Sequence, residues 1–428
     1  MKLVIVSVGT RGDVQPYIAV ARALMARGHE VTFAVSDEHA PLLRTYGVAH
    51  RPMRGSVRAL LETDLGRAWL ASADSPRKYA RYGNELFLPM QRALCEDADA
   101  AVEGADGVVF YAMAMHAMHA AERRKLPMVA VAPWPIAPSR EVPPVLAPFL
   151  SRAPGFVKSA ASHWSARVAF AGFNGVHLDY RRSVGLPSWR AKDTLHAVLD
   201  AGIPTVHLFS EAVIRRPADW APQHAVAGYA FVPRRAYEPP RALADFLASG
   251  PAPVYIGFGS MTGFEPEKLA TLTTSAARLA GVRAVVATGW ASLASTSSDD
   301  VYALDELPHE WLFPRVAAVV HHGGAGTFAE GLRAGRPTVI SAFFADQPFW
   351  GHLNERLGTG PRALRRSSLT AEKLASAIRL ALDGPHRTAA ESLGERLRSE
   401  DGAARAAELI EAAMTTGGAP RRALAQSP

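Results

Sequence analysis

The sequence predicts an α/β protein of two domains, each a parallel sheet covered by helices on both faces. Three observations predict this fold. The chain has 428 residues, too many for one core and suited to two domains. Short apolar stretches, typical of buried parallel strands, alternate with longer stretches of helical periodicity. This alternation restarts after a Pro-rich segment near residue 240.

The first half opens with the strand-like stretch "KLVIVSV". It continues with "VQPYIAVARALMARGHE", whose apolar residues recur at helical spacing up to Gly28. The stretches "VTFAVS", "GVVFYAM" and "MVAVAPW" supply further strands. Residues 139–160 are rich in proline, and we expect them to form a long mobile connection.

The second half begins beyond the Pro-rich linker with the strand-like "PVYIGFG" and continues with "AVVAT", "VYALDEL", "AAVVHH" and "PTVISAF". Helical stretches separate these strands. The expected organisation is a first domain over 1–232, a linker and entry helix over 233–250, a second domain over 251–395, a C-terminal helix over 396–415 and a disordered tail over 416–428.

Composition argues against several classes of protein. The net charge is +7, but the 47 basic residues form no run of five and are not interleaved with aromatic residues, so we expect no nucleic-acid partner. Either a genome that favours arginine or a positive field that attracts an anionic substrate explains the charge. No apolar run of about 18 residues is present, so we expect no stable membrane insertion. The N-terminal apolar run is too short for a signal peptide, and the single cysteine, Cys95, fits the reducing cytoplasm.

The stretch "VVHHGGAGTFAEG" joins a strand to a helix through a glycine-rich turn. In open α/β sheets such turns lie at the ligand-binding edge, and the free N–H groups at a helix start bind phosphate. Gly324 and Gly326 let the backbone approach an anion, with Thr327 beside them. His322 can donate a hydrogen bond to a phosphate oxygen, whereas its neighbour His321 points to the opposite face of the strand, toward the core.

Four further residues extend this predicted phosphate site toward a sugar nucleotide. Glu330 lies one turn into the helix, where its carboxylate can bind a ribose diol. Asp346 and Gln347 follow the next strand at the same edge, and an adjacent acid and amide suit vicinal sugar hydroxyls. Ser260 ends the first strand of the second domain and is a candidate contact to the diphosphate.

Asp13, in "GTRGDVQP", is a candidate general base, and it lies at the carboxyl end of the first strand, the edge where open α/β sheets bind ligands. The alternative is that Asp13 only N-caps a helix that starts at Val14. Arg11 and Gly12 precede Asp13 and are predicted to contact the donor.

Five residues are candidates for an apolar acceptor site. The stretch "MAMHAMHAAE" follows a strand and offers Met113, Met115 and His116, and Phe87 and Trp134 are similar candidates. Flexible methionine side chains adapt well to apolar ligands. The same residues at helical spacing are also typical of a core, so both interpretations stay open.

The pair Asp97 and Asp99 has the spacing of a metal-binding acidic motif, but it lies in a helical stretch. Residues two apart on a helix point about 200° apart, so the carboxylates diverge on a solvated face. No other cluster of metal ligands is visible in the sequence, and we expect no metal.

The stretch "HGGAGTFAEG", followed by "GRP" and "ADQP", resembles the donor signature of the family 1 nucleotide-sugar glycosyltransferases. The matching positions are His322, Gly324, Thr327, Glu330, Asp346 and Gln347. The stretches "VGTRGDVQPYIAVARALMARGHEVTFAVS" and "PHEWLFPRVAAVVHHGGAGT" resemble the sterol and antibiotic-aglycone branch of that family. The similarity covers nearly the whole chain and is weakest over residues 55–240.

The resemblance implies the GT-B fold, two Rossmann-like domains facing across a cleft, with a C-terminal helix that crosses back to the first domain. It also implies an inverting, metal-independent transfer of a hexose to a hydroxyl of an apolar aglycone, with Asp13 as the base. UDP-glucose is the favoured donor and a TDP-sugar the alternative, while a sterol, macrolide, polyketide or phenol fits as acceptor. The nucleotide-sugar is a co-substrate and no further cofactor is implied. The expected state is a monomer or a homodimer.

The chain departs from the plant members of that family at the nucleobase. Those members place a Trp and a Gln before the motif histidine, whereas here His309 follows Pro308 and no Trp precedes them. The loop Leu304–His309 is therefore expected to hold the nucleobase, mainly through its backbone. Uridine and thymidine both stay open.

Three other functions fit part of the sequence. Gly324, Gly326 and Asp346 mimic a dinucleotide fingerprint, but a dehydrogenase carries that fingerprint after the first strand of its domain. A sugar-nucleotide epimerase of the same fold needs further carboxylates. A nucleotide-sugar-binding protein without catalysis has no need of Asp13.

Overall fold

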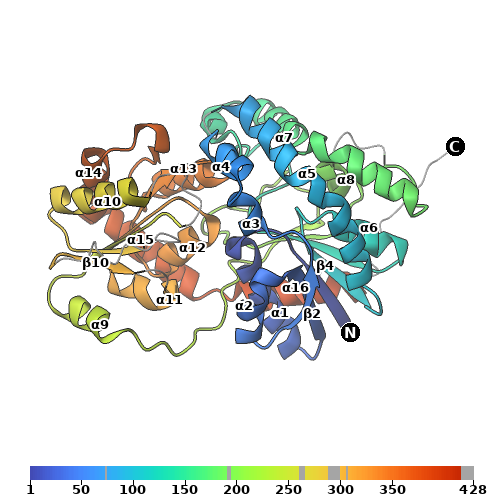
Figure 1. Cartoon of the computed structure of the whole chain (residues 1–428), viewed down its shortest axis with the longest axis horizontal. Coiled ribbons are helices and arrows are strands. Elements are labelled where there is room, and N and C mark those ends of the chain that lie inside the picture. The colour runs from blue at the N-terminus through green and yellow to red at the C-terminus, as the bar shows by residue number, and fades with distance from the viewer. Residues whose placement is uncertain (73–74, 190–193, 260–265, 288–298, 305–306, 416–428) are drawn as a thin grey trace. The chain divides into compact units, whose positions relative to one another are not determined.

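The computed structural model describes residues 1–72, 75–189, 194–259, 266–287, 299–304 and 307–415 (Figure 1). These residues form two compact units. Unit 1 comprises Met1–Val232 together with the segment that starts at Asp401, and unit 2 comprises Pro233–Glu400. Each unit contains one parallel sheet with helices packed on it, which confirms the predicted fold class of two parallel-sheet α/β domains.

Unit 1 contains a seven-stranded parallel sheet in the order β3-β2-β1-β4-β5-β6-β7. Its strands are β1 (Lys2–Val6), β2 (Glu30–Ser36), β3 (Ala49–Met53), β4 (Gly107–Tyr111), β5 (Met128–Ala132), β6 (Thr205–His207) and β7 (His224–Val226). The strand order changes direction at β1 and β4, so the carboxyl ends of these two strands lie at a topological switch point, where open α/β sheets bind ligands. β4 and β5 are buried along their whole length.

The helices of unit 1 connect these strands and cover the sheet. They are α1 (Arg11–Ala26), the short 3₁₀ helix η1 (Asp37–His39), α2 (Ala40–Thr45), α3 (Val57–Leu61), α4 (Asp64–Ala71), α5 (Pro76–Ala101), α6 (His116–Arg123), the 3₁₀ helix η2 (Pro148–Arg152), α7 (Gly155–Ser183) and α8 (Thr194–Asp200). The expectation of one long mobile connection over 139–160 is wrong. Its prolines permit a helix start, and η2 and the first turns of α7 occupy half of it.

Unit 2 contains a six-stranded sheet in the order β10-β9-β8-β11-β12-β13. Its strands are β8 (Val254–Gly257), β9 (Ala284–Ala287), β10 (Val301–Leu304), β11 (Ala318–His321), β12 (Thr338–Ala342) and β13 (Leu364–Arg365). Its helices are α9 (Arg241–Ala248), α10 (Pro266–Ala280), α11 (His309–Leu312), η4 (Phe313–Arg315), α12 (Ala325–Arg333), α13 (Gln347–Leu357), η5 (Arg366–Ser368), α14 (Ala371–Leu382) and α15 (Gly384–Arg398). The glycine-rich turn between β11 and α12 therefore lies at the carboxyl end of a central strand.

The last described helix, α16 (Gly402–Thr415), belongs to unit 1 although it follows unit 2 in the sequence. The helix is interrupted between Arg398 and Gly402. The segment 396–415 therefore contains the end of α15 and then α16 rather than one helix. α16 packs on α1 and β5, and Ile410 is fully buried there. Gly402 allows the close approach, because a Cβ at this position would lie 2.4 Å from the carbonyl carbon of Gly228.

No helix in the described parts of the chain is long and apolar enough to cross a membrane. The longest, α7, mixes polar and apolar residues throughout and includes several charged side chains.

The burial of α16 predicts how unit 1 responds to a truncated side chain. Replacing a fully buried isoleucine by alanine typically costs about 2–5 kcal/mol. We expect Ile410→Ala to lower the free energy of unfolding of unit 1 by this amount and to leave unit 2 unchanged, as measured by calorimetry that resolves two transitions. Glu408→Ala, on the exposed face of the same helix, is the control. A shift confined to the unit 2 transition would contradict the assignment of α16.

Candidate active site

Asp13 lies in the first turn of α1, just beyond the carboxyl end of β1. The expectation that Asp13 could be the N-cap of a helix starting at Val14 is wrong, because α1 begins at Arg11 and Thr10 is its N-cap. The turn before the helix needs glycine. Gly9 has φ +135°, and a Cβ there would lie 2.3 Å from Asp13 Oδ2.

Three donors surround the Asp13 carboxylate. The backbone N–H of Thr10 donates to Oδ2 at 2.8 Å, and the Thr10 hydroxyl donates to the same oxygen at 3.0 Å. The Tyr111 hydroxyl is the third donor. Burial raises the pKa of Asp13 above its ordinary value, and the hydrogen bonds from Thr10 and Tyr111 only partly oppose this. A carboxylate with a raised pKa is a stronger base, which suits proton abstraction from an alcohol.

Aromatic rings lie next to this carboxylate. Tyr111 ends β4, the neighbour of β1, and its ring meets the ring of Tyr17 edge-on with centroids 5.6 Å apart. On another side it meets Trp134 edge-on at 5.8 Å. Trp134, predicted as an acceptor residue, therefore packs directly against Tyr111, which hydrogen-bonds the candidate base Asp13. The sequence prediction missed Tyr111, although its place at the end of the strand beside β1 was a usable signal.

The other predicted acceptor residues divide into two groups. Phe87 on α5 is partly exposed and meets Trp69 edge-on at 5.2 Å, and Met113 is partly exposed after β4. Met115 and His116 are buried in the core of unit 1, and burial lowers the pKa of His116 to about 3. Their burial favours the packing interpretation, and we do not carry them forward as acceptor contacts.

In unit 2, the turn between β11 and α12 has the shape of an anion site. Gly323 has φ +95°, and a Cβ there would lie 2.8 Å from Ile340 Cγ2, so the turn needs glycine. Gly324 is the N-cap of α12 and has no side chain that could occupy the first N–H groups of the helix. These N–H groups and the helix dipole favour an anion at this position. Gly326 is exposed and Thr327 partly exposed in the same turn.

The two adjacent histidines of this turn have different surroundings. His321 is fully buried, as predicted, and its Nδ1 accepts a hydrogen bond from the Gly323 N–H at 3.0 Å. His322 lies against Gly324, where a Cβ would come within 2.6 Å of its Nε2. Burial lowers the pKa of His322 to about 4, so its imidazole is neutral at physiological pH. Its buried Nδ1 has no hydrogen-bond partner among the described residues, which leaves a polar atom for a ligand.

Glu330 lies one turn further along α12 and faces Arg333, whose Nη1 is 3.8 Å from its carboxylate. Burial raises the pKa of Glu330 to about 7, and the attraction of Arg333 opposes this only in part. Perturbed acids of this kind are frequent in binding sites. The position fits the predicted ribose contact.

The turn after β12 carries Asp346 and Gln347, which the sequence prediction treated as one pair. The structure gives them different roles. The Gln347 side chain is buried, and its Oε1 accepts hydrogen bonds from the N–H groups of Phe343 (2.7 Å) and Phe344 (3.2 Å). Asp346 is partly exposed and accepts from Trp350 Nε1 at 2.7 Å. Gln347 thus holds the turn in shape, and Asp346 is the better candidate for a sugar hydroxyl.

The backbone of this turn is itself unusual. Ala345 has φ +53°, a left-handed conformation that a residue with a Cβ rarely adopts. Such backbone strain often occurs at ligand-binding sites. It places Asp346 as the N-cap of α13, at the same edge of the sheet as the α12 turn.

The contacts of the remaining predicted donor residues say less about their roles. His309 begins α11, stacks on Phe313 with centroids 4.4 Å apart, and has its Nε2 3.3 Å from the Tyr255 hydroxyl. Arg11 and Gly12 are exposed at the start of α1 in unit 1, where Arg11 Nε donates to Gln15 Oε1 at 3.0 Å. Ser260 lies outside the described residues. The donor roles of these four residues stay predictions.

Family models and known proteins match the chain over most of its length. Residues 3–88 match the glycosyltransferase family 28 N-terminal domain, and residues 275–412 match the C-terminal domain described as erythromycin biosynthesis protein CIII-like. Two sterol 3-beta-glucosyltransferases of Arabidopsis thaliana are 34% and 32% identical to it. These matches cover 94% and 95% of this chain and 64% and 67% of the relatives. The chain belongs to the sterol and aglycone branch of the family 1 glycosyltransferases.

The length covered differs among the relatives of this glycosyltransferase. A sterol 3-beta-glucosyltransferase of Emericella nidulans is 31% identical over 96% of the chain, but the match spans only 30% of the fungal protein. The chain therefore spans about two thirds of the plant relatives and less than a third of this fungal one.

Solved structures show the same GT-B fold. The glycosyltransferase of kitacinnamycin has a TM-score of 0.68 and 21% identity, covering 96% of this chain and 99% of its own. The calicheamicin glycosyltransferase CalG4 has a TM-score of 0.69 and 18% identity, covering 97% and 98%. VinC, solved in complex with dTDP, has a TM-score of 0.68 and 18% identity, covering 97% and 100%.

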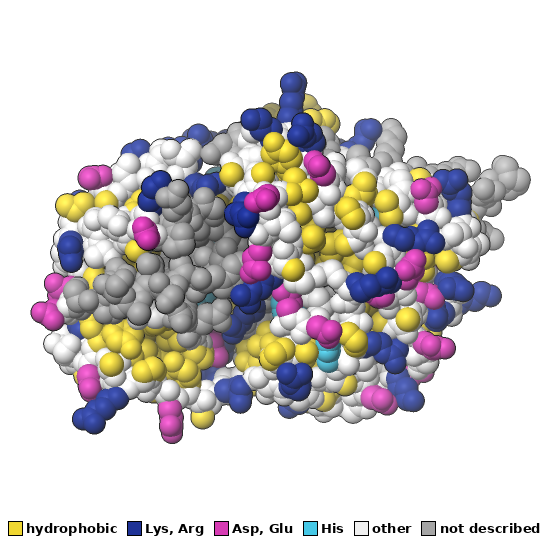
Figure 2. Space-filling model, viewed as in Figure 1, with side chains coloured by type: hydrophobic (Ala, Val, Ile, Leu, Met, Phe, Trp, Pro, Cys, Tyr) yellow, Lys and Arg dark blue, Asp and Glu magenta, His cyan; other side chains and the backbone are white. Residues whose placement is uncertain are grey.

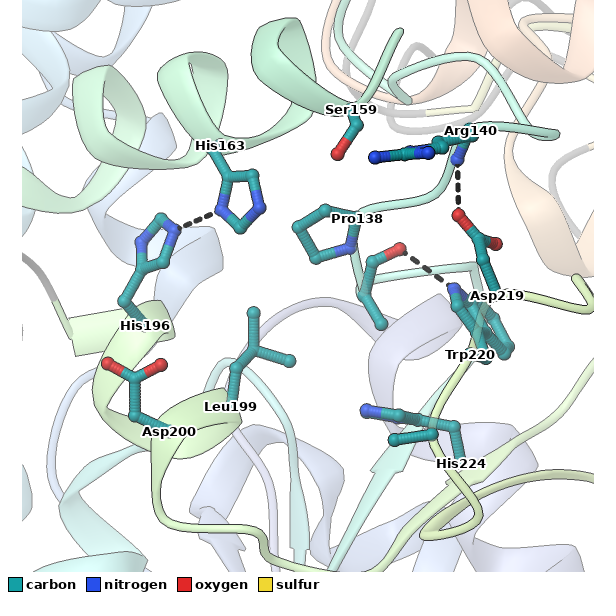
Figure 3. A pocket seen from close by; sticks show the side chains of 12 residues that line it. Pro138, Arg140, Ser159, His163, His196, Leu199, Asp200, Asp219, Trp220 and His224 are labelled. Atoms are coloured by element: carbon teal, nitrogen blue, oxygen red, sulfur yellow. Dashed lines mark hydrogen bonds between the residues drawn. The ribbon is translucent and has the colours of Figure 1, made fainter. Parts of the chain in front are cut away.

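Unit 1 of the glycosyltransferase also contains a pocket of about 420 Å³ that the sequence prediction did not find. His163 of α7 and His196 of α8 point toward each other there, with Nδ1 and Nε2 2.8 Å apart (Figure 3). On the opposite side the Arg140 N–H donates to Asp219 at 2.6 Å. The mixed acidic and basic lining differs from the aromatic surroundings of Asp13, so we do not assign the aglycone to this pocket.

Three potential metal ligands meet in the core of unit 1, on three different helices. The ligand atoms of Cys95, His119 and His177 all lie within 4.8 Å of one another. Arg181 Nη1 donates to His119 Nδ1 at 3.3 Å, so the proton of His119 sits on Nε2, which donates to His177 at 2.9 Å. This hydrogen-bond chain uses the lone pairs of His119 and His177 that a metal ion would need. The cluster fits a buried polar network better than a metal site.

The two carboxylates of the acidic motif on α5 bind different partners. Asp97 pairs with Arg54 at 2.8 Å, and Asp99 pairs with Arg123 at 2.7 Å and with Arg124. The divergence expected from helical geometry is therefore present, although the carboxylates are ion-paired and partly buried rather than freely solvated.

The unpaired Nδ1 of His322 predicts a specific loss on mutation. A hydrogen bond to a charged group contributes about 1.5–3 kcal/mol, so His322→Ala should weaken UDP binding roughly ten- to a hundredfold. Isothermal titration calorimetry measures this directly. His321→Ala shows what loss of a structural histidine looks like: it should lower the melting temperature, because His321 is fully buried and its Nδ1 accepts the Gly323 N–H. Equal UDP affinity in His322→Ala and wild type would make His322 a structural residue.

The pKa of Glu330 predicts a pH dependence of nucleotide binding. Because this acid is protonated below about pH 7, its carboxylate is fully available to a ribose diol only above that pH. The affinity for UDP should therefore fall about tenfold from pH 8 to pH 6. Glu330→Gln cannot titrate and should show only the change that comes from UDP itself. Identical pH profiles in the two proteins would remove Glu330 from the site.

Proposed function

We propose that this glycosyltransferase transfers a hexose from a nucleoside-diphosphate sugar to a hydroxyl group of a sterol or a similar polycyclic aglycone. UDP-glucose is the proposed donor, supported by the names of the plant and fungal relatives as glucosyltransferases. A TDP-sugar is the alternative, supported by the dTDP complex of a structural neighbour. The reaction is proposed to take place in the cytoplasm, where the buried thiol of Cys95 fits a reducing environment.

One observation carries the proposal: a partly buried carboxylate, held by Thr10 and Tyr111, with the partly exposed ring of Trp134 packed against Tyr111. The exposed part of the Trp134 ring presents a flat apolar surface that suits fused rings. The raised pKa of Asp13 matches the work of taking a proton from a weakly acidic alcohol. A protein that only binds nucleotide-sugars has no use for such a base.

In the proposed mechanism Asp13 accepts the proton of the acceptor hydroxyl. The acceptor oxygen then forms a bond to the anomeric carbon as the bond from that carbon to the diphosphate oxygen breaks, which inverts the configuration. Negative charge grows on the departing diphosphate. The N–H groups at the start of α12 and the neutral imidazole of His322 are proposed to stabilise this charge. They supply the electrostatic help that a divalent cation supplies in other enzymes, so the proposed reaction needs no metal.

The donor is proposed to lie along the edge of the unit 2 sheet. The diphosphate binds at the α12 turn, the ribose diol at Glu330 and a sugar hydroxyl at Asp346. Gln347 positions Asp346 by holding the backbone of the turn. His309, packed on Phe313, is proposed to flank the nucleobase.

Asp13→Asn tests the proposed base. Asparagine keeps a side-chain oxygen that can accept the Thr10 hydrogen bonds, so the variant should melt near the wild-type temperature and bind UDP normally. A positioned general base contributes about 10²–10⁴-fold, so transfer of glucose from UDP-glucose to a sterol should slow at least about a hundredfold. A phenol acceptor should be partly rescued because it loses its proton more easily. Mass spectrometry of the glucoside, with and without EDTA, measures each rate.

Asp106→Asn is the matched control, since its carboxylate also accepts a backbone N–H, from Lys2 at 2.6 Å, but at the opposite end of β1. It should leave the rate unchanged. Full activity of Asp13→Asn on the sterol would place the base elsewhere. Activity that EDTA abolishes and Mg²⁺ restores would contradict metal independence.

A further inference from the structure

Large apolar side chains are exposed together in one short segment of unit 1. Phe149, Phe156 and Trp164 are 81%, 69% and 66% exposed, and Leu146 is half-exposed. Among the described residues, the structure has only three other exposed large apolar side chains, and those are scattered at Met1, Leu279 and Leu380. A concentration of this kind marks a surface that binds something apolar.

Local structure explains why these side chains share a surface. Phe149 lies in η2, and α7 begins at Gly155, a few residues further along the chain. Along α7 the exposed positions Phe156, His163 and Trp164 recur at helical spacing and therefore lie on one side of the helix. Ala166 lies on another side and is buried. The name α7 surface is used below for Leu146, Phe149, Phe156 and Trp164.

The stretch of chain that carries the α7 surface has positive charge and no negative charge. No Asp or Glu occurs from Val142 to Leu178, whereas Arg152, Lys158 and Arg167 fall within this stretch. Arg152 and Arg167 are exposed and Lys158 is partly exposed. Cations thus lie before, between and after the aromatic residues.

The neighbouring helix α5 adds to this charge. α5 runs alongside α7 in the same direction, because Gly172 lies against Asn84 and the Tyr180 ring lies 5.3 Å from the Arg92 guanidinium. In both contacts the α7 residue follows its α5 partner by the same number of positions, as expected for parallel helices. This offset places the exposed basic residues at the start of α5 beside the turn of α7 that follows Trp164; they are Arg77, Lys78 and Arg81. Figure 2 shows Lys and Arg side chains next to apolar ones, with a few Asp and Glu side chains among them, over the part of unit 1 formed by α4 and α5.

We propose that the α7 surface docks unit 1 onto a membrane that contains anionic lipids. The aromatic side chains enter the boundary between headgroups and acyl chains, and the surrounding cations face the lipid phosphates. Phe and Trp in a basic setting are typical of proteins that lie on a membrane without crossing it.

The charge pattern favours a membrane over a second copy of the chain. In a symmetric dimer the same patch faces itself, so its basic residues would meet one another, and the stretch Val142–Leu178 holds no acid to compensate. An anionic lipid surface has the complementary charge. If the acceptor is a sterol, docking also brings the enzyme to the phase that holds it, and this consequence alone rests on the proposed function.

The test is co-sedimentation of the full chain with vesicles of phosphatidylcholine, with and without phosphatidylglycerol. We expect binding to the anionic vesicles and at least about tenfold weaker binding by the triple variant Phe149→Ser, Phe156→Ser, Trp164→Ser. Leu279→Ser with Leu380→Ser is the control for lost apolar surface in unit 2. Arg152→Glu and Arg167→Glu should each weaken binding about fivefold or more, whereas the control Arg241→Glu, exposed on α9, should not.

Equal sedimentation of wild type and triple variant would overturn the proposal, and so would equal binding to the neutral and anionic vesicles. A wild-type dimer that the triple variant dissociates, without vesicle binding, would assign the surface to self-association instead. Sedimentation does not depend on catalysis, so failure of the proposed function leaves this result intact. If both proposals hold, the triple variant should glucosylate a water-soluble phenol at the wild-type rate and a vesicle-embedded sterol more slowly.

Discussion

Two glycine turns, at Gly9 in unit 1 and Gly323 in unit 2, determine where the candidate catalytic groups lie. Each turn follows a strand in the middle of its sheet and starts a helix, and each adopts a backbone conformation that a Cβ would block. The two helix starts are then used differently. In unit 1 the N–H and hydroxyl of Thr10 donate to the carboxylate of Asp13, so a side chain of the protein itself occupies the helix start. In unit 2 Gly324 brings no side chain, which leaves the helix start for an anion from outside.

Burial acts in the same direction on the three titratable groups of these sites. It raises the pKa of Asp13 and Glu330 and lowers the pKa of His322, so it favours the neutral form each time. A binding site with few charges of its own has little competition for the helix dipole of α12. In the proposed mechanism a diphosphate at this position is therefore the dominant charge, and fixed N–H groups stabilise that charge without first giving up another partner.

Patterns local in sequence predicted the strands, the glycine turn and the separation of His321 from His322, since the two sides of a strand alternate. Contacts between segments were not predictable in the same way. The Tyr111 hydroxyl reaches Asp13 only because β4 pairs with β1, and Gln347 turns inward because the backbone of Phe343 and Phe344 offers two N–H groups. The predicted start of α1 was wrong for a reason that is local in sequence. Thr10 and Asp13 have the spacing of a capping box, which would have placed the helix start correctly.

The position of α16 has a consequence for the order in which the chain can fold during synthesis. Unit 2 is continuous in sequence, so all its residues are available to it once Glu400 has left the ribosome. Unit 1 is synthesised earlier, yet the face formed by α1 and β5 stays uncovered until α16 emerges. During that interval the first half of the protein exposes apolar surface that the finished protein buries, and it is in this window that a nascent chain is most prone to aggregation and most dependent on chaperones.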